Sequence, residues 1–146
     1  MRKPTSSAAV PSAPASHPSR PQYRRLRVYA FDPSLATRVE TAVLNRVTVK
    51  VPWERLRPGP VGEYVEVVDF DPASQCFYAP VNLEHPYLLA RDGLDPAEGN
   101  PQFHQQMVYA VSMTTIGHFE RALGRVALWS AYDPATGRER SVRRLR

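Results

Sequence analysis

The chain has 146 residues, of which 42% are hydrophobic and 23% are charged, and its formal net charge is +5 at pH 7. Its single cysteine, Cys76, excludes an intramolecular disulfide framework and a thiolate zinc cage, because both need several cysteines. Residues 28–137 hold eight Lys or Arg against thirteen Asp or Glu, whereas the two ends together hold eleven against one. The basic character therefore belongs to the ends of the chain.

Residues 1–22 are rich in Pro, Ser and Ala and show no apolar periodicity, so we predict a disordered leader. No continuous apolar segment follows Arg2 and Lys3, which argues against a secretory signal and favours a cytoplasmic location. The lack of acidic residues in this leader leaves an organellar transit peptide as the alternative.

We expect residues 23–137 to form an α+β region. The pattern RRLRVYAF predicts a first strand from Leu26 to Phe31. Asp32 is suited to cap an amphipathic helix from Pro33 to Asn45, because Pro33 then occupies the first helical position. Alternating valines predict a second strand from Arg46 to Val51.

After a Pro- and Gly-rich connection, alternation predicts a third strand from Tyr64 to Phe70. The loop Asp71–Ser74 is typical of a hairpin, so we expect a fourth strand, Gln75–Ala79, to pair antiparallel with the third and Cys76 to pack on it. Pro86–Ala90 is long enough for one short turn of helix.

The segment from Pro101 to Leu123 predicts one long helix. Asn100 is a suitable N-cap, Pro101 suits the first position, and Gly124 stands where a helix commonly ends. The middle of this helix is apolar almost all round, which predicts a central helix covered on several sides. Its apolar run, Met107–Ile116, is too short for the ~20 residues that span a bilayer, so no membrane partner is expected.

The last part of the chain is expected to hold a short strand or an extended segment at Val126–Trp129, a loop at Asp133–Gly137, and a basic end at residues 138–146. The tetrapeptide RRLR opens the first strand and recurs at Arg143–Arg146, where we interpret it as the start of a truncated strand. The predicted fold is therefore α+β, with a small, mostly antiparallel sheet and two helices, and it has the character of an incomplete domain.

The candidate chemistry is sparse, and we assign no catalytic or cofactor-binding residue. His104 and His118 are the candidate metal ligands, but they are fourteen residues apart, or roughly 21 Å along a helix, and cannot share one ion. A helical zinc pair needs ligands about one turn apart, as in His-Glu-x-x-His, and neither histidine has such a neighbour.

The block CFYAPVNLEHPYLLARDGLDPAEGNPQFHQQMVYAVSMTTIGHFERALGR, and above all Asn100–Arg125, resembles the N-terminal region of large, uncharacterised bacterial proteins. The later part of those proteins carries a thermolysin-like HExxH zinc-peptidase motif, and the resemblance covers about residues 24–146. It implies zinc only for the longer relatives, because this chain contains no HExxH sequence.

The resulting hypothesis is a non-catalytic N-terminal portion of a metallopeptidase-like protein. Its partner is then the downstream peptidase-like region, or another chain that covers the helix at residues 101–123. The alternative is a stand-alone binding module whose basic ends contact nucleic acid or an acidic protein. An independent enzyme that uses His104 or His118 is the third and weakest hypothesis.

Overall fold

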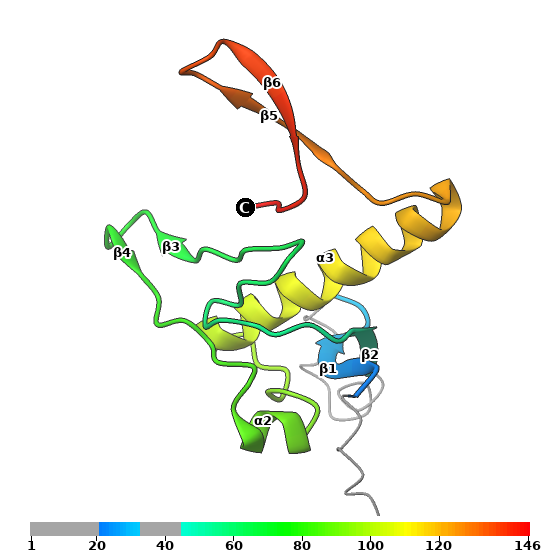
Figure 1. Cartoon of the computed structure of the whole chain (residues 1–146). Coiled ribbons are helices and arrows are strands. Elements are labelled where there is room, and N and C mark those ends of the chain that lie inside the picture. Colours follow the sequence, from blue (N-terminus) through cyan, green and yellow to red (C-terminus); the bar gives the residue numbers. More distant parts are fainter. Residues whose placement is uncertain (1–20, 33–44) are drawn as a thin grey trace, which may run out of the picture.

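The computed structural model describes residues 21–32 and 45–146. Within them the fold is α+β, as predicted, with small antiparallel sheets and two helices (Figure 1). The elements are β1 Tyr23–Tyr29, β2 Arg46–Pro52, β3 Phe70–Asp71, β4 Cys76–Phe77, α2 Pro86–Ala90, α3 Pro101–Leu123, β5 Trp129–Asp133 and β6 Arg138–Val142. The predicted leader, up to residue 20, and residues 33–44 of the predicted first helix lie outside the described residues.

Strands β1 and β2 form an antiparallel ribbon that carries one side of the core. The alternation of β1 turns Arg24, Leu26 and Val28 inward, and all three are buried. Leu26 lies opposite Val49 in the register, and Arg24 lies opposite the fully buried Val51. The prediction of both strands is confirmed, although β1 begins at Tyr23 and not at Leu26.

The predicted strand from Tyr64 to Phe70 is wrong for most of its length, because only Phe70 belongs to a paired strand, β3. Backbone hydrogen bonds from this segment go to different places. The Val65 carbonyl accepts from Gly62 N at 2.8 Å, whereas Glu66 N donates to the Leu145 carbonyl at 2.8 Å. No single neighbouring strand supplies a continuous ladder.

The hairpin after this segment is confirmed, since β3 and β4 pair antiparallel around the Asp71–Ser74 turn. The Asp71 carboxylate accepts from Ala73 N at 3.0 Å and from the Ser74 hydroxyl at 2.6 Å, and these hydrogen bonds lower the Asp71 pKa. Cys76 lies on β4 as expected, but it is exposed and does not pack against the core.

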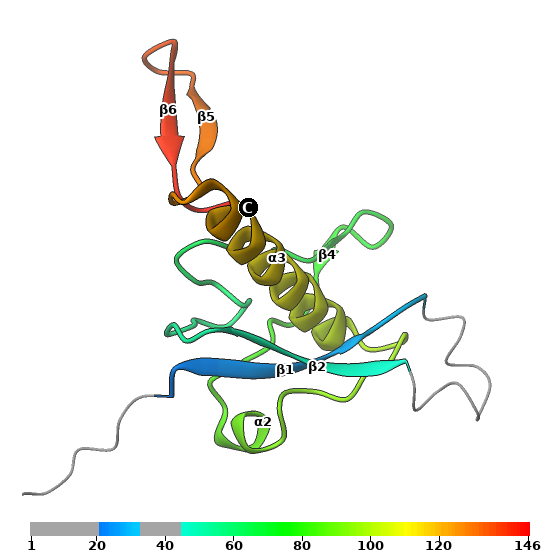
Figure 2. The same cartoon turned by 90° about the vertical axis from the view of Figure 1, so that its right-hand side faces the viewer.

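Helix α3 begins and ends where the sequence predicts. The Asn100 side chain accepts from Gln102 N at 3.0 Å and from Phe103 N at 3.3 Å, and Gly124 closes the helix with a φ of 63°. The helix crosses the β1–β2 ribbon obliquely (Figure 2) and turns one face towards it. The buried residues of that face are Phe103, Gln105, Gln106, Tyr109, Ala110, Met113 and Ile116.

The expectation that α3 is covered all round is wrong. Val108, Val111, Phe119 and Leu123 are 51%, 46%, 60% and 54% exposed. The reason is that the described segments, β1, β2 and the loops that bond to Gln105, Gln106 and Tyr109, pack on one side of the helix and leave the opposite side open. Helix α3 therefore has apolar side chains on several sides but buries only one of those sides in the described part of the chain.

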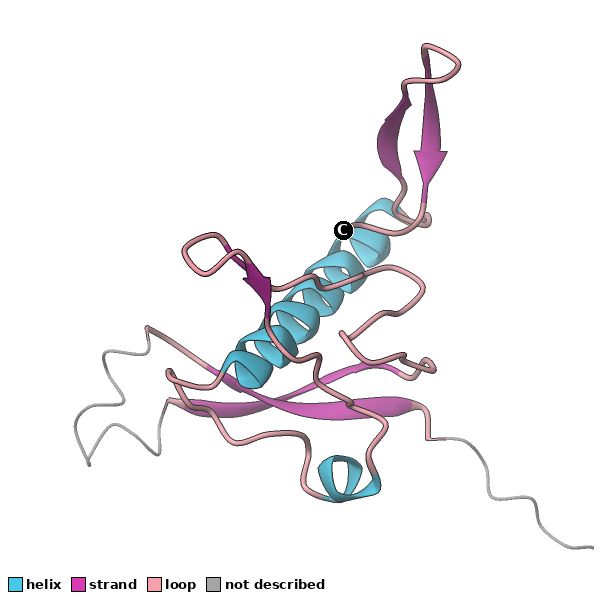
Figure 3. Ribbon diagram, turned by 90° about the vertical axis from the view of Figure 1, so that its left-hand side faces the viewer, coloured by secondary structure: helices cyan, strands magenta, loops and turns pink. Residues whose placement is uncertain are grey.

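A hairpin of β5 and β6 follows α3 and projects away from the rest of the fold (Figure 3). The expected strand at residues 126–129 is displaced to β5, while the Asp133–Gly137 turn is confirmed. Beyond β6 the chain returns as an extended segment, as expected, and Leu145 pairs in parallel with Val65. Its N–H donates to the Tyr64 carbonyl at 2.8 Å.

Candidate functional site

A buried arginine organises the polar part of the interior. Because β1 alternates, Arg24 shares the core face with Leu26, and it is only 2% exposed. Its Nη1 donates to the Leu83 carbonyl at 2.7 Å, and its Nη2 donates to the Glu54 carbonyl at 3.0 Å and forms an ion pair with Glu84. One side chain thus ties β1 to two loops that are distant in sequence.

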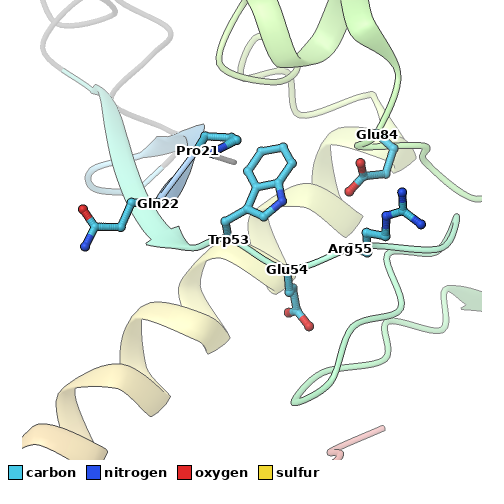
Figure 4. Close-up of a pocket in the computed structure, with 6 residues that line it drawn as sticks. All are labelled: Pro21, Gln22, Trp53, Glu54, Arg55 and Glu84. Atoms are coloured by element: carbon cyan, nitrogen blue, oxygen red, sulfur yellow. The ribbon is translucent and has the colours of Figure 1, made fainter. Parts of the chain in front are cut away.

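A cavity of about 560 Å³ opens beside this arginine. The Arg24 guanidinium lies over the Trp53 ring, 4.3 Å from its centroid. In Figure 4 the Trp53 indole stands in the middle of the cavity, with the Arg55 and Glu84 side chains on one side of it and Glu54 pointing away. The lining residues are Pro21, Gln22, Trp53, Glu54, Arg55 and Glu84.

Both carboxylates of the cavity are occupied by contacts that hold the fold. Glu84 accepts from Leu56 N at 3.0 Å in addition to its ion pair with Arg24. Glu54 accepts from the Tyr109 hydroxyl at 2.7 Å. The arrangement therefore anchors loops on the core.

Tyr109 is fully buried in the middle of α3, and its pKa is raised strongly. Burial is the main cause, and the hydrogen bond to the Glu54 carboxylate adds to it, because the carboxylate favours the protonated hydroxyl. Tyr109 is thus a permanent donor that links the helix to the loop after β2.

Two buried glutamines of α3 complete the polar interior, and the sequence-based assignment of an apolar helix missed them. Gln106 accepts from Leu94 N at 2.8 Å, and it donates to the carbonyls of Arg27 at 2.9 Å and Leu94 at 3.1 Å. Gln105 accepts from Val81 N at 2.8 Å. The available signal was a pair of adjacent amides in an otherwise apolar run.

The two candidate ligands, His104 and His118, are both exposed; His104 lies on the open side of α3, and His118 lies at the edge of that side, where the helix faces the β1–β2 ribbon. Among the described residues there is no group of three or more His, Cys, Asp or Glu that fits a metal ion. His118 instead lines a cavity of about 530 Å³ between α3 and the β1–β2 ribbon, together with Lys50 and Arg121. The zinc implied for longer relatives has no ligand set in this part of the chain.

An apolar groove lies between the last turns of α3 and the start of β5, with a volume of about 250 Å³. Next to it, the Glu120 carboxylate accepts from Ala127 N at 2.9 Å and holds the returning chain against the helix. We call this the C-terminal groove. Its residues are Thr115, Ile116, Phe119, Leu123, Arg125, Ala127, Leu128 and Trp129.

The arginines of both RRLR segments are engaged within the fold. In the first segment, the partners of Arg24, Arg25 and Arg27 are Glu84, Asp92 and Asp95. In the second, Arg143 and Arg146 pair with Glu63 and Glu66, and Arg144 donates to the Gly62 carbonyl at 2.8 Å. Arg138 and Arg140 of β6 are left with no ion pair to the described residues.

Comparison with known proteins finds no family model, no curated protein and no solved structure that matches the chain. Neither α2 nor α3, the helices in the described ranges, has the length and apolar character needed to cross a membrane.

Proposed function

We propose that the chain is a non-catalytic docking module, which forms the N-terminal portion of a larger, cytoplasmic, zinc-metallopeptidase-like bacterial protein. The observation that carries the proposal is the C-terminal groove, an open apolar surface at the base of a projecting hairpin. The resemblance of Asn100–Arg125 to the N-terminal region of HExxH-bearing proteins supports our choice of a peptidase-like region as the occupant.

The groove has the properties of an interaction surface. Phe119, Leu123 and Leu128 are each more than half exposed, and exposed apolar patches on a folded chain mark sites of association. Full burial of such a side chain contributes about 1.5–3 kcal/mol, so covering the exposed half contributes roughly 1 kcal/mol for each residue.

The hairpin beside the groove supports the same conclusion. A two-stranded hairpin is marginally stable in water unless it packs against another element. Within residues 21–32 and 45–146, strands β5 and β6 pair only with each other, and the hairpin stands away from the β1–β2 ribbon. A segment seated in the groove against Trp129 stabilises the hairpin as well, and Arg125 at the rim favours a segment that carries a carboxylate.

The test begins with the gene. We expect an HExxH-bearing region to be encoded after Arg146 or in an adjacent gene, and we expect that region to co-elute with this chain when the two are expressed together. The double variant Leu123→Asp/Leu128→Asp should abolish co-elution, because it places charges in the groove. Leu89→Asp on α2 is the matched control, since Leu89 is also exposed but lies on a different element. The absence of an HExxH region, or equal co-elution of the groove variant, contradicts the proposal.

A further inference from the structure

The open side of α3 carries a continuous stripe without charge. Six residues form it, and all six are exposed: His104, Val108, Val111, Thr115, His118 and Ala122. Over the same length, Arg121 is the one exposed residue of α3 that carries a full charge. A helix face that meets solvent is normally polar and charged. We call these six residues the α3 stripe.

The stripe runs straight along one face of the helix. Successive members are four, three, four, three and four residues apart, an average of about 3.6 residues, which is one turn of an α-helix. The stripe extends for about 27 Å along α3 at 1.5 Å per residue. A stripe of this length calls for another helix of similar length as its occupant.

We infer that the occupant is α3 of a second copy of this chain, in an antiparallel pair related by a two-fold axis. When the stripes of two copies are aligned in opposite directions, His104 lies opposite Ala122 of the other copy, Val108 opposite His118, and Val111 opposite Thr115. The two outer layers each pair an imidazole with a smaller side chain, and the central layers pair branched side chains of similar size. The stripe is therefore complementary to itself, as a two-fold interface requires.

Charge outside the stripe favours the antiparallel direction. Glu98, just before α3, and Arg125, just after it, are exposed, and neither forms an ion pair with the described residues. Antiparallel packing brings Glu98 of one copy to the same end of the pair as Arg125 of the other. It also places the positive end of each helix dipole beside the negative end of the other, which is favourable, whereas a parallel pair would place like ends together.

This inference uses a different face of α3 from the proposed function, since the stripe and the C-terminal groove share only Thr115, while Arg125 lines the groove and also lies at the end of the pair. The first test is sedimentation velocity of the full chain over a range of protein concentrations, and we expect a reversible species of twice the monomer mass. Val111→Asp introduces a carboxylate from each copy beside the two-fold axis and should weaken association more than about a hundredfold. Val68→Asp is the matched control, since Val68 is similarly exposed but lies far from the stripe in sequence.

The second test fixes the direction of packing with two double variants that change the same exposed positions. His104→Glu/Ala122→Lys places opposite charges across an antiparallel pair and should retain the dimer, whereas His104→Glu/Ala122→Glu should dissociate it. In a parallel pair both variants would set like charges against each other. A monomeric wild-type chain at all concentrations, or equal association of the two double variants, overturns the inference. Loss of co-elution by the groove variant with retention of this dimer shows that the two surfaces act separately.

Discussion

Replacing Gln106 by Leu tests whether the polar interior of α3 holds the fold together. The substitution replaces the amide with a shorter apolar side chain and removes three hydrogen bonds, which join Gln106 to Leu94 N, to the Leu94 carbonyl and to the Arg27 carbonyl. Gln106 is 0% exposed, so water does not replace the amide at its own position. Each backbone group that loses its buried partner costs about 1–3 kcal/mol. Leu94 is half-buried and regains some hydration, which favours the lower end of that range.

The expected loss is therefore roughly 3 kcal/mol of unfolding free energy. Equilibrium unfolding in urea measures it, with the fluorescence of Trp53 and Trp129 as the signal. With an m value of about 2 kcal/mol/M, the midpoint should fall by roughly 1.5 M. Gln102→Leu is the matched control, because the Gln102 side chain donates only one exposed hydrogen bond, to the Ala79 carbonyl at 3.0 Å. If the two variants lose the same stability, the buried amide does not carry the role assigned to it.

Three further predictions concern the buried polar groups and the basic ends. The pKa of Tyr109 is higher in the folded state than in the unfolded state, so Tyr109 contributes its full stability below pH ~10 and less above that pH, where the unfolded chain ionises. The stability of Tyr109→Phe should therefore depend less on alkaline pH than that of the wild type. Arg24→Met leaves Glu84, whose side chain is 31% exposed, without its cation, and thermal unfolding should show a loss of about 2–3 kcal/mol. Titration of duplex DNA over a salt series tests nucleic acid as the alternative partner. Each phosphate contact, by Arg138 or by Arg140, should lower the slope of log affinity against log salt concentration by about 0.9, and a flat response removes nucleic acid as a partner.

The elements with local signals were predictable from the sequence. Asn100, Pro101 and Gly124 fix both ends of α3 through contacts and dihedral angles within a few residues, and the sequence displays them directly. The β1–β2 ribbon was predictable because alternation identifies the buried face of each strand without reference to the partner.

The elements that depend on distant partners were not predictable. The segment at residues 64–70 alternates like a strand, but its hydrogen bonds are divided between a nearby loop and Leu145. Arg24 belongs to the basic N-terminal end of the chain in the sequence, yet it lies in the core, where it bonds to Leu83 and Glu84. Neither outcome has a local signal, because each depends on loops that meet only in the folded chain.

The same limitation explains which side of α3 became the interior. Apolar side chains stand on several sides of the helix, so hydrophobicity alone does not choose among them. The chosen side is the one that carries Gln105, Gln106 and Tyr109, whose polar atoms bond to loops and to β1. If the helix were turned over, the α3 stripe would be buried instead, and it has few groups that can bond to those loop carbonyls and N–H groups. Each backbone group left without a hydrogen-bond partner would then cost about 1–3 kcal/mol of stability. Hydrogen bonding thus selects the inner face, and an uncharged outer face remains for a partner that, like the stripe, offers few hydrogen bonds.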